Sequence, residues 1–247
     1  RTPAMRPPRM RPPRMRLLST RLVVGTLAVV ALTTGCTRDI SGTARSDPHG
    51  PATKVTEDGY GILAGDPEAP IQLELFTEPQ CTHCADLQKD FGNEIARYMT
   101  QGRLAITYRP LTFLDPEHDS DSGDHGAGHS ARVSNALFLA AGPQTSAKVF
   151  QLFVEDLWSH QEPGGKGPSD SEIADLARES GVPGDAVEKM KTGTSAVNIA
   201  DMAEVNFEYL YEVNPLQTGT PTVYDLKRDD TVDIYDDNWL SALMSRA

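Results

Sequence analysis

Two cysteines separated by two residues impose the strongest constraint on this chain. The Cys-Thr-His-Cys motif at 81–84 directly follows the apolar run 71–76 and precedes a segment, 86–98, whose apolar residues recur at helical spacing. This order predicts a strand, a short loop and a helix, with Cys81 where the helix begins. The first N–H groups of a helix have no partner within it, so a thiolate at that place is stabilised over a thiol.

The position of the motif predicts a role for each of its residues. Cys81 is expected to be the nucleophile, because the thiolate is the reactive form in disulfide exchange. Cys84, one turn further on, is expected to be more buried and to act as the resolving thiol. His83 is expected to donate a hydrogen bond or a positive charge to the Cys81 sulfur, and Thr82 completes the catalytic motif. A stabilised thiolate stabilises the reduced form, which makes the disulfide oxidising.

Other uses of two cysteines fit the sequence less well. A zinc ribbon needs a second pair of ligands, and the chain has one further cysteine, Cys36, far from the motif. A structural disulfide across two intervening residues closes too small a loop to add much stability. An inert buried pair is a further alternative. Redox chemistry is the interpretation that the position of the motif favours.

The N-terminal segment has the pattern of a secretory signal. Residues 1–35 hold seven arginines and no acidic residue. A translation start at Met15 would leave residues 1–14 untranslated. From Met15 a basic region leads into the apolar run 22–32, which is the order of a signal peptide. That run is too short to predict a transmembrane helix.

The end of this signal resembles a bacterial lipobox, in which a cysteine is lipidated and becomes the first residue. The sequence at 32–36 is Leu-Thr-Thr-Gly-Cys, with Thr33 where an aliphatic residue is usual. We therefore expect Cys36 to carry a lipid anchor; an ordinary signal peptide with an incidental cysteine is the alternative. Residues 36–59 are rich in Ser, Thr, Asp, Gly and Pro, which predicts a flexible tether after the lipidated cysteine.

The charge of the chain narrows its partners and location. Without residues 1–35, Lys plus Arg falls from 23 to 16 against 35 acidic residues, which gives a net charge of about −19. Such a balance argues against nucleic acid and against electrostatic binding to anionic lipid. We expect an extracytoplasmic domain that touches the membrane only through its lipid anchor, or a secreted one if the lipobox is not used.

The remaining chain alternates strand and helix patterns, which predicts an α/β fold. Leu104–Tyr108 would close a right-handed βαβ unit with the strand before the motif. Helical stripes then follow, and Ser169 and Glu172 predict a capping box at the start of one of these helices. A hairpin and a final amphipathic helix end the chain. The predicted parts are 60–128, a first half with the cysteines; 129–213, a helical insertion; and 214–247, a second half.

A polar stretch at 115–130 joins the first two of these parts. It contains Asp and His residues, which are suitable metal ligands. Its Gly and Ser content and its lack of helical spacing favour a solvated loop over a metal site.

From about Tyr60 onward the chain resembles the thioredoxin-fold disulfide oxidoreductases, in particular the DsbA-like branch with a helical domain inserted in the fold. The resemblance rests on the motif at 81–84 after a strand, the helical insertion, and Thr220-Pro221 before the final hairpin. It implies a central mixed sheet flanked by helices, a cis peptide bond before Pro221, and substrate cysteines that contact the backbone of Thr220.

The resemblance also implies a function. The Cys81–Cys84 disulfide would be donated to newly exported, reduced client proteins through a mixed disulfide on Cys81, with no cofactor beyond that disulfide. A membrane reoxidase of the DsbB or vitamin K epoxide reductase type would restore it. An exported location suits such chemistry, because disulfides persist outside the reducing cytosol.

Two departures from the family pattern concern proton transfer. Thr82 stands where proline is frequent, and Leu75 stands where many members place a buried acid. Its neighbour Glu74 should face the other way. Proton transfer would then use water, His83 or Glu78.

Several rival functions stay open at this point. The protein could act as a reductase or an isomerase with the same chemistry. It could be a copper-binding lipoprotein that uses Cys81, Cys84 and a histidine as ligands. It could also be a peptide-binding module that keeps the fold and makes little use of the cysteines.

Overall fold

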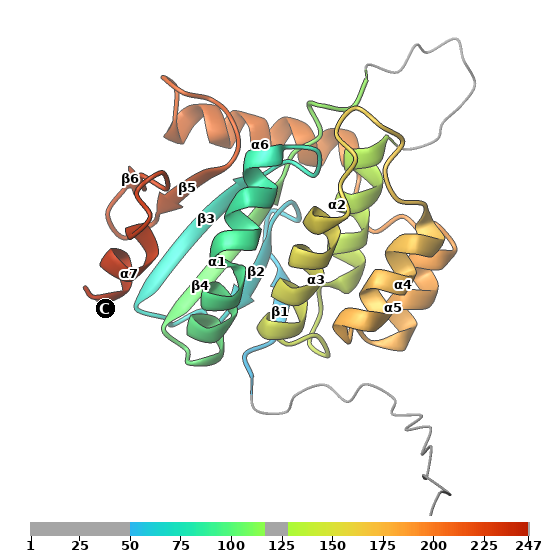
Figure 1. The fold of residues 1–247 in the computed structure, drawn as a ribbon, viewed down its shortest axis with the longest axis horizontal. Helices are drawn as coiled ribbons and strands as arrows, with labels where there is room; N and C mark the ends of the chain where they lie inside the picture. Colours follow the sequence, from blue (N-terminus) through green and yellow to red (C-terminus); the bar gives the residue numbers. More distant parts are fainter. Residues whose placement is uncertain (1–49, 117–127, 247) are drawn as a thin grey trace, which may run out of the picture. The chain divides into compact units, whose positions relative to one another are not determined.

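The computed structural model describes residues 50–116 and 128–246 (Figure 1). The predicted signal peptide, the predicted lipidation site Cys36 and most of the polar stretch at 115–130 lie outside these residues. The described chain folds around one mixed sheet with strand order β1-β2-β4-β3-β5-β6. The strands are β1 Thr53–Val55, β2 Ile62–Gly65, β3 Ile71–Thr77, β4 Leu104–Pro110, β5 Thr222–Asp225 and β6 Asp230–Thr231.

The centre of the sheet is the predicted βαβ unit. β3 and β4 run parallel, with Ile71 opposite Leu104 and Thr77 opposite Pro110, and α1 (Thr82–Thr100) connects them. The other neighbouring strands are antiparallel. β4 is buried along its whole length, which explains why its sequence reads as a continuous run rather than an alternation.

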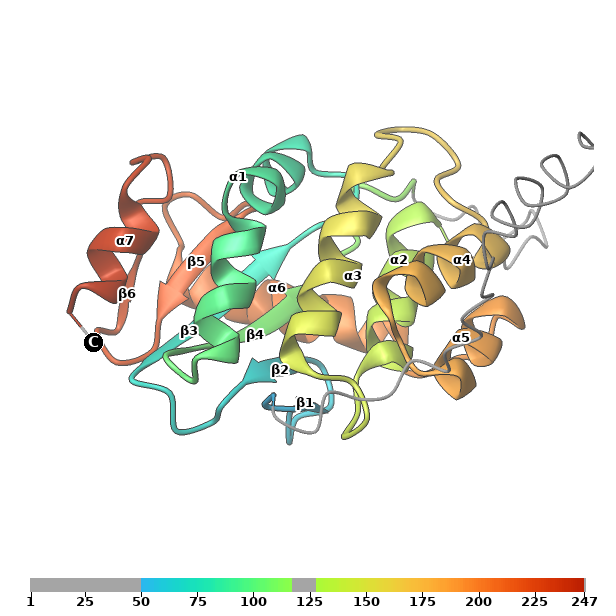
Figure 2. The ribbon, with the colours of Figure 1, turned by 60° about the horizontal axis from the view of Figure 1, so that its bottom comes forward.

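Among the described residues, five helices lie between β4 and β5, and one follows the last strand. They are α2 His129–Ala140, α3 Ala147–Ser159, α4 Asp170–Ser180, α5 Gly184–Lys191, α6 Ile199–Val213 and α7 Trp239–Met244. α1 lies on one face of the sheet and α6 crosses the other, while α2, α4 and α5 gather beside the sheet beyond α3 (Figures 1 and 2). The capping box predicted for α4 is confirmed, since Ser169 and Glu172 each accept from the other's backbone N–H.

The predicted tether extends too far toward the fold. Residues 53–55, placed in the tether at 36–59, form β1 and pair antiparallel with β2. Thr53 is buried, and its hydroxyl donates a hydrogen bond of 3.1 Å to the carbonyl of Gly142. A three-residue edge strand is too short to show a periodic pattern, so the sequence alone does not reveal it.

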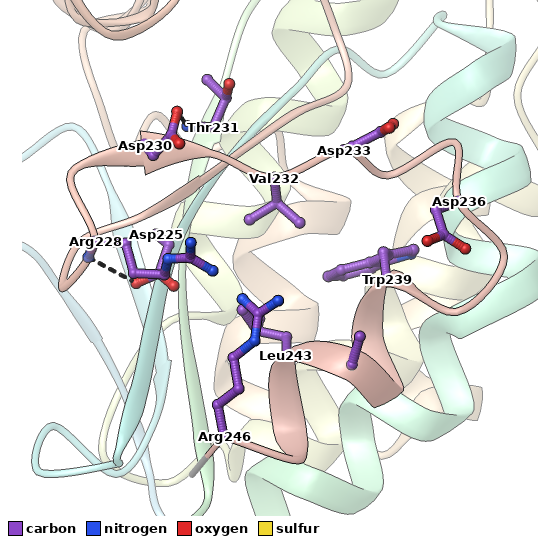
Figure 3. A pocket seen from close by; sticks show the side chains of 11 residues that line it. Asp225, Arg228, Asp230, Thr231, Val232, Asp233, Asp236, Trp239, Leu243 and Arg246 are labelled. Atoms are coloured by element: carbon purple, nitrogen blue, oxygen red, sulfur yellow. Dashed lines mark hydrogen bonds between the residues drawn. The ribbon is translucent and has the colours of Figure 1, made fainter.

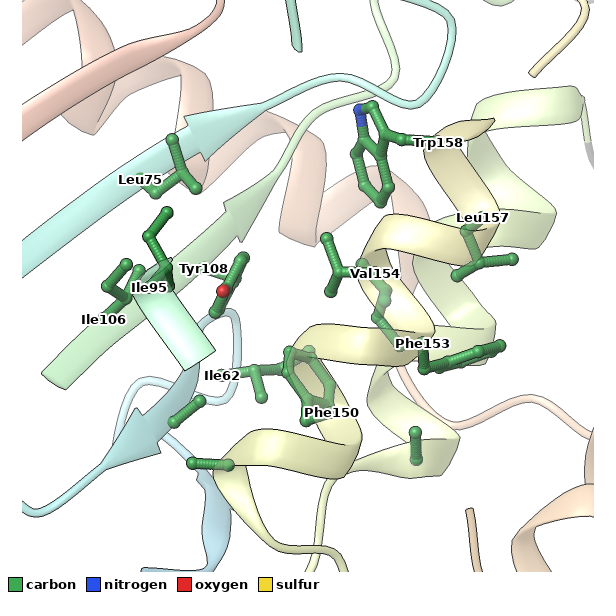
Figure 4. Close-up of a cluster of buried hydrophobic side chains, with 14 of the residues drawn as sticks. Ile62, Leu75, Ile95, Ile106, Tyr108, Phe150, Phe153, Val154, Leu157 and Trp158 are labelled. Carbon is green, nitrogen blue, oxygen red and sulfur yellow. The ribbon is translucent and has the colours of Figure 1, made fainter. Parts of the chain in front are cut away.

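Alternate side chains of β3 serve the two faces of the sheet. Leu75 belongs to the main core with α1 and α3, whereas Phe76 belongs to a smaller cluster with Leu210 of α6. On the α3 side, Phe150 and Val154 point toward Tyr108 of β4 (Figure 4), and the rings of Tyr108 and Phe150 are 5.3 Å apart. Each such side chain contributes about 1.5–3 kcal/mol through burial. Leu87 and Ile95 of α1 belong to the same core, so the helix that carries the motif packs against the sheet.

Gly65, at the end of β2, gives a direct test of this packing. Its φ is +117°, and an added Cβ would lie 2.6 Å from the carbonyl oxygen of Leu104. We expect Gly65→Ala to lower the free energy of unfolding by roughly 1–3 kcal/mol, because both the backbone and the space exclude a side chain. Urea unfolding followed by circular dichroism measures the change.

The matched control is Gly184→Ala at the start of α5, where nothing lies within 4 Å of an added Cβ. Alanine favours a helix over glycine, so this variant should be neutral or slightly stabilised. Equal stabilities of the two variants would contradict the packing described here.

Candidate active site

The cysteine pair lies at the junction between β3 and α1. Cys81 is the N-cap of α1, with extended backbone angles, and Cys84 lies within the first turn. The Cys81 side chain is partly exposed, whereas Cys84 is 1% exposed. Both thiols are in the free form. The nucleophile and the resolving thiol expected from the sequence thus occupy accessible and buried positions, respectively.

The surroundings of Cys81 favour its thiolate. The pKa of Cys81 is lowered to about 6 by hydrogen bonds to its sulfur, first from the Cys84 thiol and then from the Thr220 side chain and the backbone N–H groups of Cys84 and His83, while burial opposes the shift. These donors stabilise a negative sulfur, as expected for the start of a helix. Cys81 is therefore largely ionised at neutral pH.

The surroundings of Cys84 have the opposite effect. Burial raises the pKa of the Cys84 thiol well above its ordinary value, and the neighbouring Cys81 raises it further. The Thr77 side chain and the Glu78 backbone N–H act in the other direction and are outweighed. Cys81 is thus ionised, whereas Cys84 keeps its proton and donates it in a hydrogen bond to the Cys81 sulfur.

The loop before β5 completes the site. The Thr220–Pro221 peptide bond is cis, as the resemblance implied. The Cys81 sulfur lies 3.2 Å from the Thr220 carbonyl oxygen, to which it donates a hydrogen bond in its protonated form, so this loop and the motif are in contact. A groove of about 720 Å³ lies beside the loop. It is lined by Asn214, Gln217, residues 219–223 and residues 231–235.

The two middle residues of the motif point to solvent. Thr82 and His83 are both exposed, and the His83 ring lies 3.9 Å from the carboxylate of Asp86. The group of His83 that acts on the Cys81 sulfur is its backbone N–H. A role for the His83 ring toward Cys81 and a catalytic role for Thr82 stay predictions.

The acidic residues near the motif occupy different environments. Leu75 is in the apolar core, and Glu74 faces the α6 side of the sheet, as expected, where it accepts from Arg109 Nε at 2.9 Å. Glu78 is completely buried between β3 and α1, and burial raises its pKa to about 7. Glu78 is therefore the buried acid of this site.

Sequence reasoning missed the partners of Glu78. Ser130 of α2 donates a short hydrogen bond to the Glu78 carboxylate, and Gln80 lies in contact with both Ser130 and Asp115. Gln161 reaches the carbonyl oxygens of Pro79 and Cys81. These are ordinary polar residues scattered along the chain, so no motif marks them.

A second hollow lies away from the thiols, between the β5–β6 hairpin and α7 (Figure 3). It has a volume of about 190 Å³. Aspartates and the arginines Arg228 and Arg246 surround it, together with Trp239, and it contains no cysteine or histidine. None of the side chains that line this hollow can take part in disulfide exchange.

Metal-binding groups and membrane-spanning helices are both absent from the described residues. Residues 50–116 and 128–246 contain no group of three or more His, Cys, Asp or Glu side chains arranged to hold a metal ion. The same residues include no helix with the length and apolar character needed to cross a bilayer.

The fold and the site together define a protein of thioredoxin type with a Cys-x-x-Cys pair beside a cis-proline loop. A family model described as thioredoxin matches residues 57–225. The chain belongs to this thioredoxin family.

Solved structures share the fold. MdbA, a thiol-disulfide oxidoreductase from Corynebacterium matruchotii, is 21% identical, with a TM-score of 0.62 over 78% of this chain and 92% of that one. DsbA from Mycobacterium tuberculosis is 19% identical, with a TM-score of 0.56 over 76% and 92%. DsbG from the same organism is 22% identical, with a TM-score of 0.53 over 74% and 82%. These matches confirm the predicted fold class, a thioredoxin fold with inserted helices.

Curated sequences extend the comparison to a different kind of protein. The serine/threonine-protein kinase PknE of Mycobacterium tuberculosis is 28% identical over 188 residues, which are 74% of this chain. The chain spans 31% of the length of that kinase.

The hydrogen bond from Cys84 to Cys81 can be tested with two variants in a Cys36→Ser background, where Cys81 is the remaining cysteine. Cys84→Ser keeps a hydroxyl donor, whereas Cys84→Ala removes the donor. A hydrogen bond to a charged group contributes about 1.5–3 kcal/mol, so the pKa of Cys81 should be roughly one to two units higher in the alanine variant. The rate of iodoacetamide reaction as a function of pH measures this pKa.

The direction of the change in rate follows from the form of Cys81 that reacts, which is the thiolate. Below the pKa of Cys81 the thiolate fraction, and with it the rate, falls about tenfold per pH unit. At pH values near 6 the alanine variant should therefore react more slowly than the serine variant. The same pKa in both variants would contradict the assigned role of Cys84.

Proposed function

We propose that this chain is an exported thiol–disulfide oxidoreductase that donates the Cys81–Cys84 disulfide to reduced proteins. The observation that carries the proposal is the asymmetry of the pair: a partly exposed Cys81 with a pKa of about 6 beside a buried Cys84 with a raised pKa. Stabilising the thiolate stabilises the dithiol form, and a pair stabilised in its dithiol form is an oxidant. The oxidoreductase named in the MdbA comparison supports the same chemistry.

The first step is attack on the oxidised pair. A client thiolate attacks the sulfur of Cys81, a client–Cys81 disulfide forms, and the Cys81–Cys84 bond breaks. Cys84 leaves as a thiolate and takes up a proton, which its burial favours. Attack on Cys81 rather than Cys84 follows from their exposure.

The second step releases the oxidised client. A second client thiol loses its proton and attacks the client sulfur of the mixed disulfide. Cys81 leaves as the stabilised thiolate, and two electrons have passed from the client to the pair. A membrane reoxidase of the DsbB or vitamin K epoxide reductase type would accept those electrons and restore the disulfide.

Clients would bind along the cis-proline loop. The Thr220 carbonyl oxygen, which lies 3.2 Å from the Cys81 sulfur, is positioned for the backbone or cysteine of an extended client. The groove of about 720 Å³ beside it has room for neighbouring client side chains. We assign Thr220 and Pro221 to client binding on this basis.

Location is part of the proposal. The signal pattern and the lipobox-like sequence support an extracytoplasmic protein held to the membrane by a lipid on Cys36. The acidic composition fits a domain that does not itself bind anionic lipid.

Two other functions of the same fold are the alternatives. A reductase would use the same pair to pass electrons to client disulfides. An isomerase would use it to rearrange disulfides within a client. A peptide-binding module that makes little use of the cysteines is the other alternative, and the similarity to a segment of a protein of different activity, the kinase PknE, is the observation in its favour. The redox potential separates a reductase from disulfide donation, and rearrangement of a client with mispaired disulfides separates an isomerase.

We expect the redox potential of Cys81–Cys84, measured by equilibration with glutathione buffers, to lie between about −120 and −180 mV, the range of strong oxidants and isomerases. The low pKa of Cys81 is the physical reason. A value near −270 mV, that of thioredoxin, would exclude disulfide donation and indicate a reductase. Oxidation of a reduced, unfolded model protein by the disulfide form measures the activity directly.

The order of attack gives a further expectation. Mixed with a disulfide-containing client, the Cys84→Ala variant should accumulate a covalent complex through Cys81, because it lacks a resolving thiol. The matched variant Cys81→Ala should accumulate little, since Cys84 is 1% exposed. Non-reducing electrophoresis quantifies the complex, with Cys36→Ser in both chains. Equal amounts of complex would rule out the assigned roles.

A further inference from the structure

The turn that carries Cys81 is built around one carboxylate. The Cys81 N–H donates to the Glu78 carbonyl at 3.0 Å, so residues 78–81 form a tight turn with Pro79 at its second position. The Glu78 carboxylate accepts from the Gln80 N–H at 2.5 Å within the same turn. Glu78 therefore supplies an acceptor for each of the two N–H groups that the turn presents.

The outer side of this turn rests on the helical insertion. The Ser130 hydroxyl donates to the Glu78 carboxylate and accepts from Gln80 Nε2 at 3.0 Å. Gly164, between α3 and α4, donates its N–H to Gln80 Oε1 at 2.9 Å. Gln161 donates to the carbonyl oxygens of Pro79 and Cys81 at 3.1 and 3.2 Å. The insertion thus contacts every residue of the turn.

The first turn of α2 is itself fixed in place. Asp115 accepts from the backbone N–H groups of Ser130 and Ala131 at 2.8 and 2.9 Å, and from Gln80 Nε2 at 2.9 Å. An acidic side chain at a helix N-terminus is favourable. Ser130 is therefore held in a fixed position, and a displacement of its hydroxyl would also displace the Glu78 carboxyl group.

We propose that Glu78 is a positioning residue: through Ser130 it holds the 78–81 turn against the helical insertion and so orients the Cys81 sulfur toward the N–H groups of α1 and toward Thr220. The inference rests on the thiol chemistry proposed above and adds a role for the insertion. The inserted helices set the reactivity of Cys81 without touching its sulfur.

The charge environment of Glu78 is consistent with this role. Asp115, from the segment after β4, is the charged group that raises the pKa of Glu78 together with burial. On α2, His129 has its pKa lowered by burial, and on α1 the Cys84 thiol has its pKa raised. No cation among these groups pairs with Glu78, so its carboxyl group is held by the hydrogen bonds of Ser130, of the Gln80 N–H in the turn and of the Leu114 backbone N–H. Removing one of those bonds should disturb the turn rather than an ion pair.

The test is the pKa of Cys81 in full-length Cys36→Ser chains with Glu78→Gln, Ser130→Ala or both. Loss of the contact should turn the sulfur from its donors, raise the pKa of Cys81 and slow its alkylation near pH 6 by about fivefold, which corresponds to about one hydrogen bond. The double variant should be no slower than the slower single variant, because both changes break one interaction. Ser130→Thr keeps the hydroxyl and should restore the wild-type value.

Glu155→Gln is the matched control. Glu155 on α3 is also a carboxyl group whose pKa is raised by burial, and it accepts from Gln151 on its own helix at 3.3 Å. This variant should leave the pKa of Cys81 unchanged. If Glu78→Gln does not fold, Ser130→Ala and Ser130→Thr test the same contact with Glu78 intact.

Each other result overturns the inference. An effect of the charge alone would lower the pKa of Cys81 in Glu78→Gln, because a nearby negative charge would have been removed. A lower melting temperature with an unchanged pKa would indicate a purely structural role, and additive effects would separate Glu78 from Ser130. Alkylation needs no client, so a wild-type chain that reacts at Cys81 but oxidises no protein overturns the proposed function alone.

Discussion

The hydrogen bond between the two thiols is the interaction on which the rest of the site depends. Cys84 can donate to Cys81 only because it keeps its proton, and it keeps its proton because the core around β3 and α1 excludes water from it. Cys81 accepts that bond at the start of α1, where backbone N–H groups add to it. Because α1 packs on the sheet, two identical side chains therefore have different pKa values.

Three distant parts of the chain meet at this bond. The turn 78–81 carries the nucleophile, the cis-proline loop brings Thr220 to its sulfur, and the insertion reaches the turn through Ser130 and Gln161. The parallel pair of β3 and β4 explains the meeting, since both strands end at the same edge of the sheet. The insertion begins after that edge, so its first helix starts beside the cysteines.

The sequence was a good guide to the strands and helices with long periodic patterns, and a poor one to short or irregular elements. The strand before the motif and the capped helix α4 were predicted because pattern and end signals agree there. β1 was placed in the tether because three residues carry no period. The family pattern places a buried acid six residues before Cys81, where this chain has Leu75. Glu78 was only one of several candidates for proton transfer, because residue type alone does not show which side chain is buried.

The sequence alone indicated the kind of chemistry, through two thiols at a strand–helix junction and a proline loop that marks the fold. Local order suffices for this, because a Cys-x-x-Cys motif and a helix start depend on neighbouring residues. Which groups surround the thiols depends instead on the tertiary structure. The partners of Glu78, the exposure of the His83 ring and the contact between Cys81 and Thr220 arise from segments far apart in the chain. Their proximity follows from the packing of the sheet and the inserted helices, which no local pattern encodes.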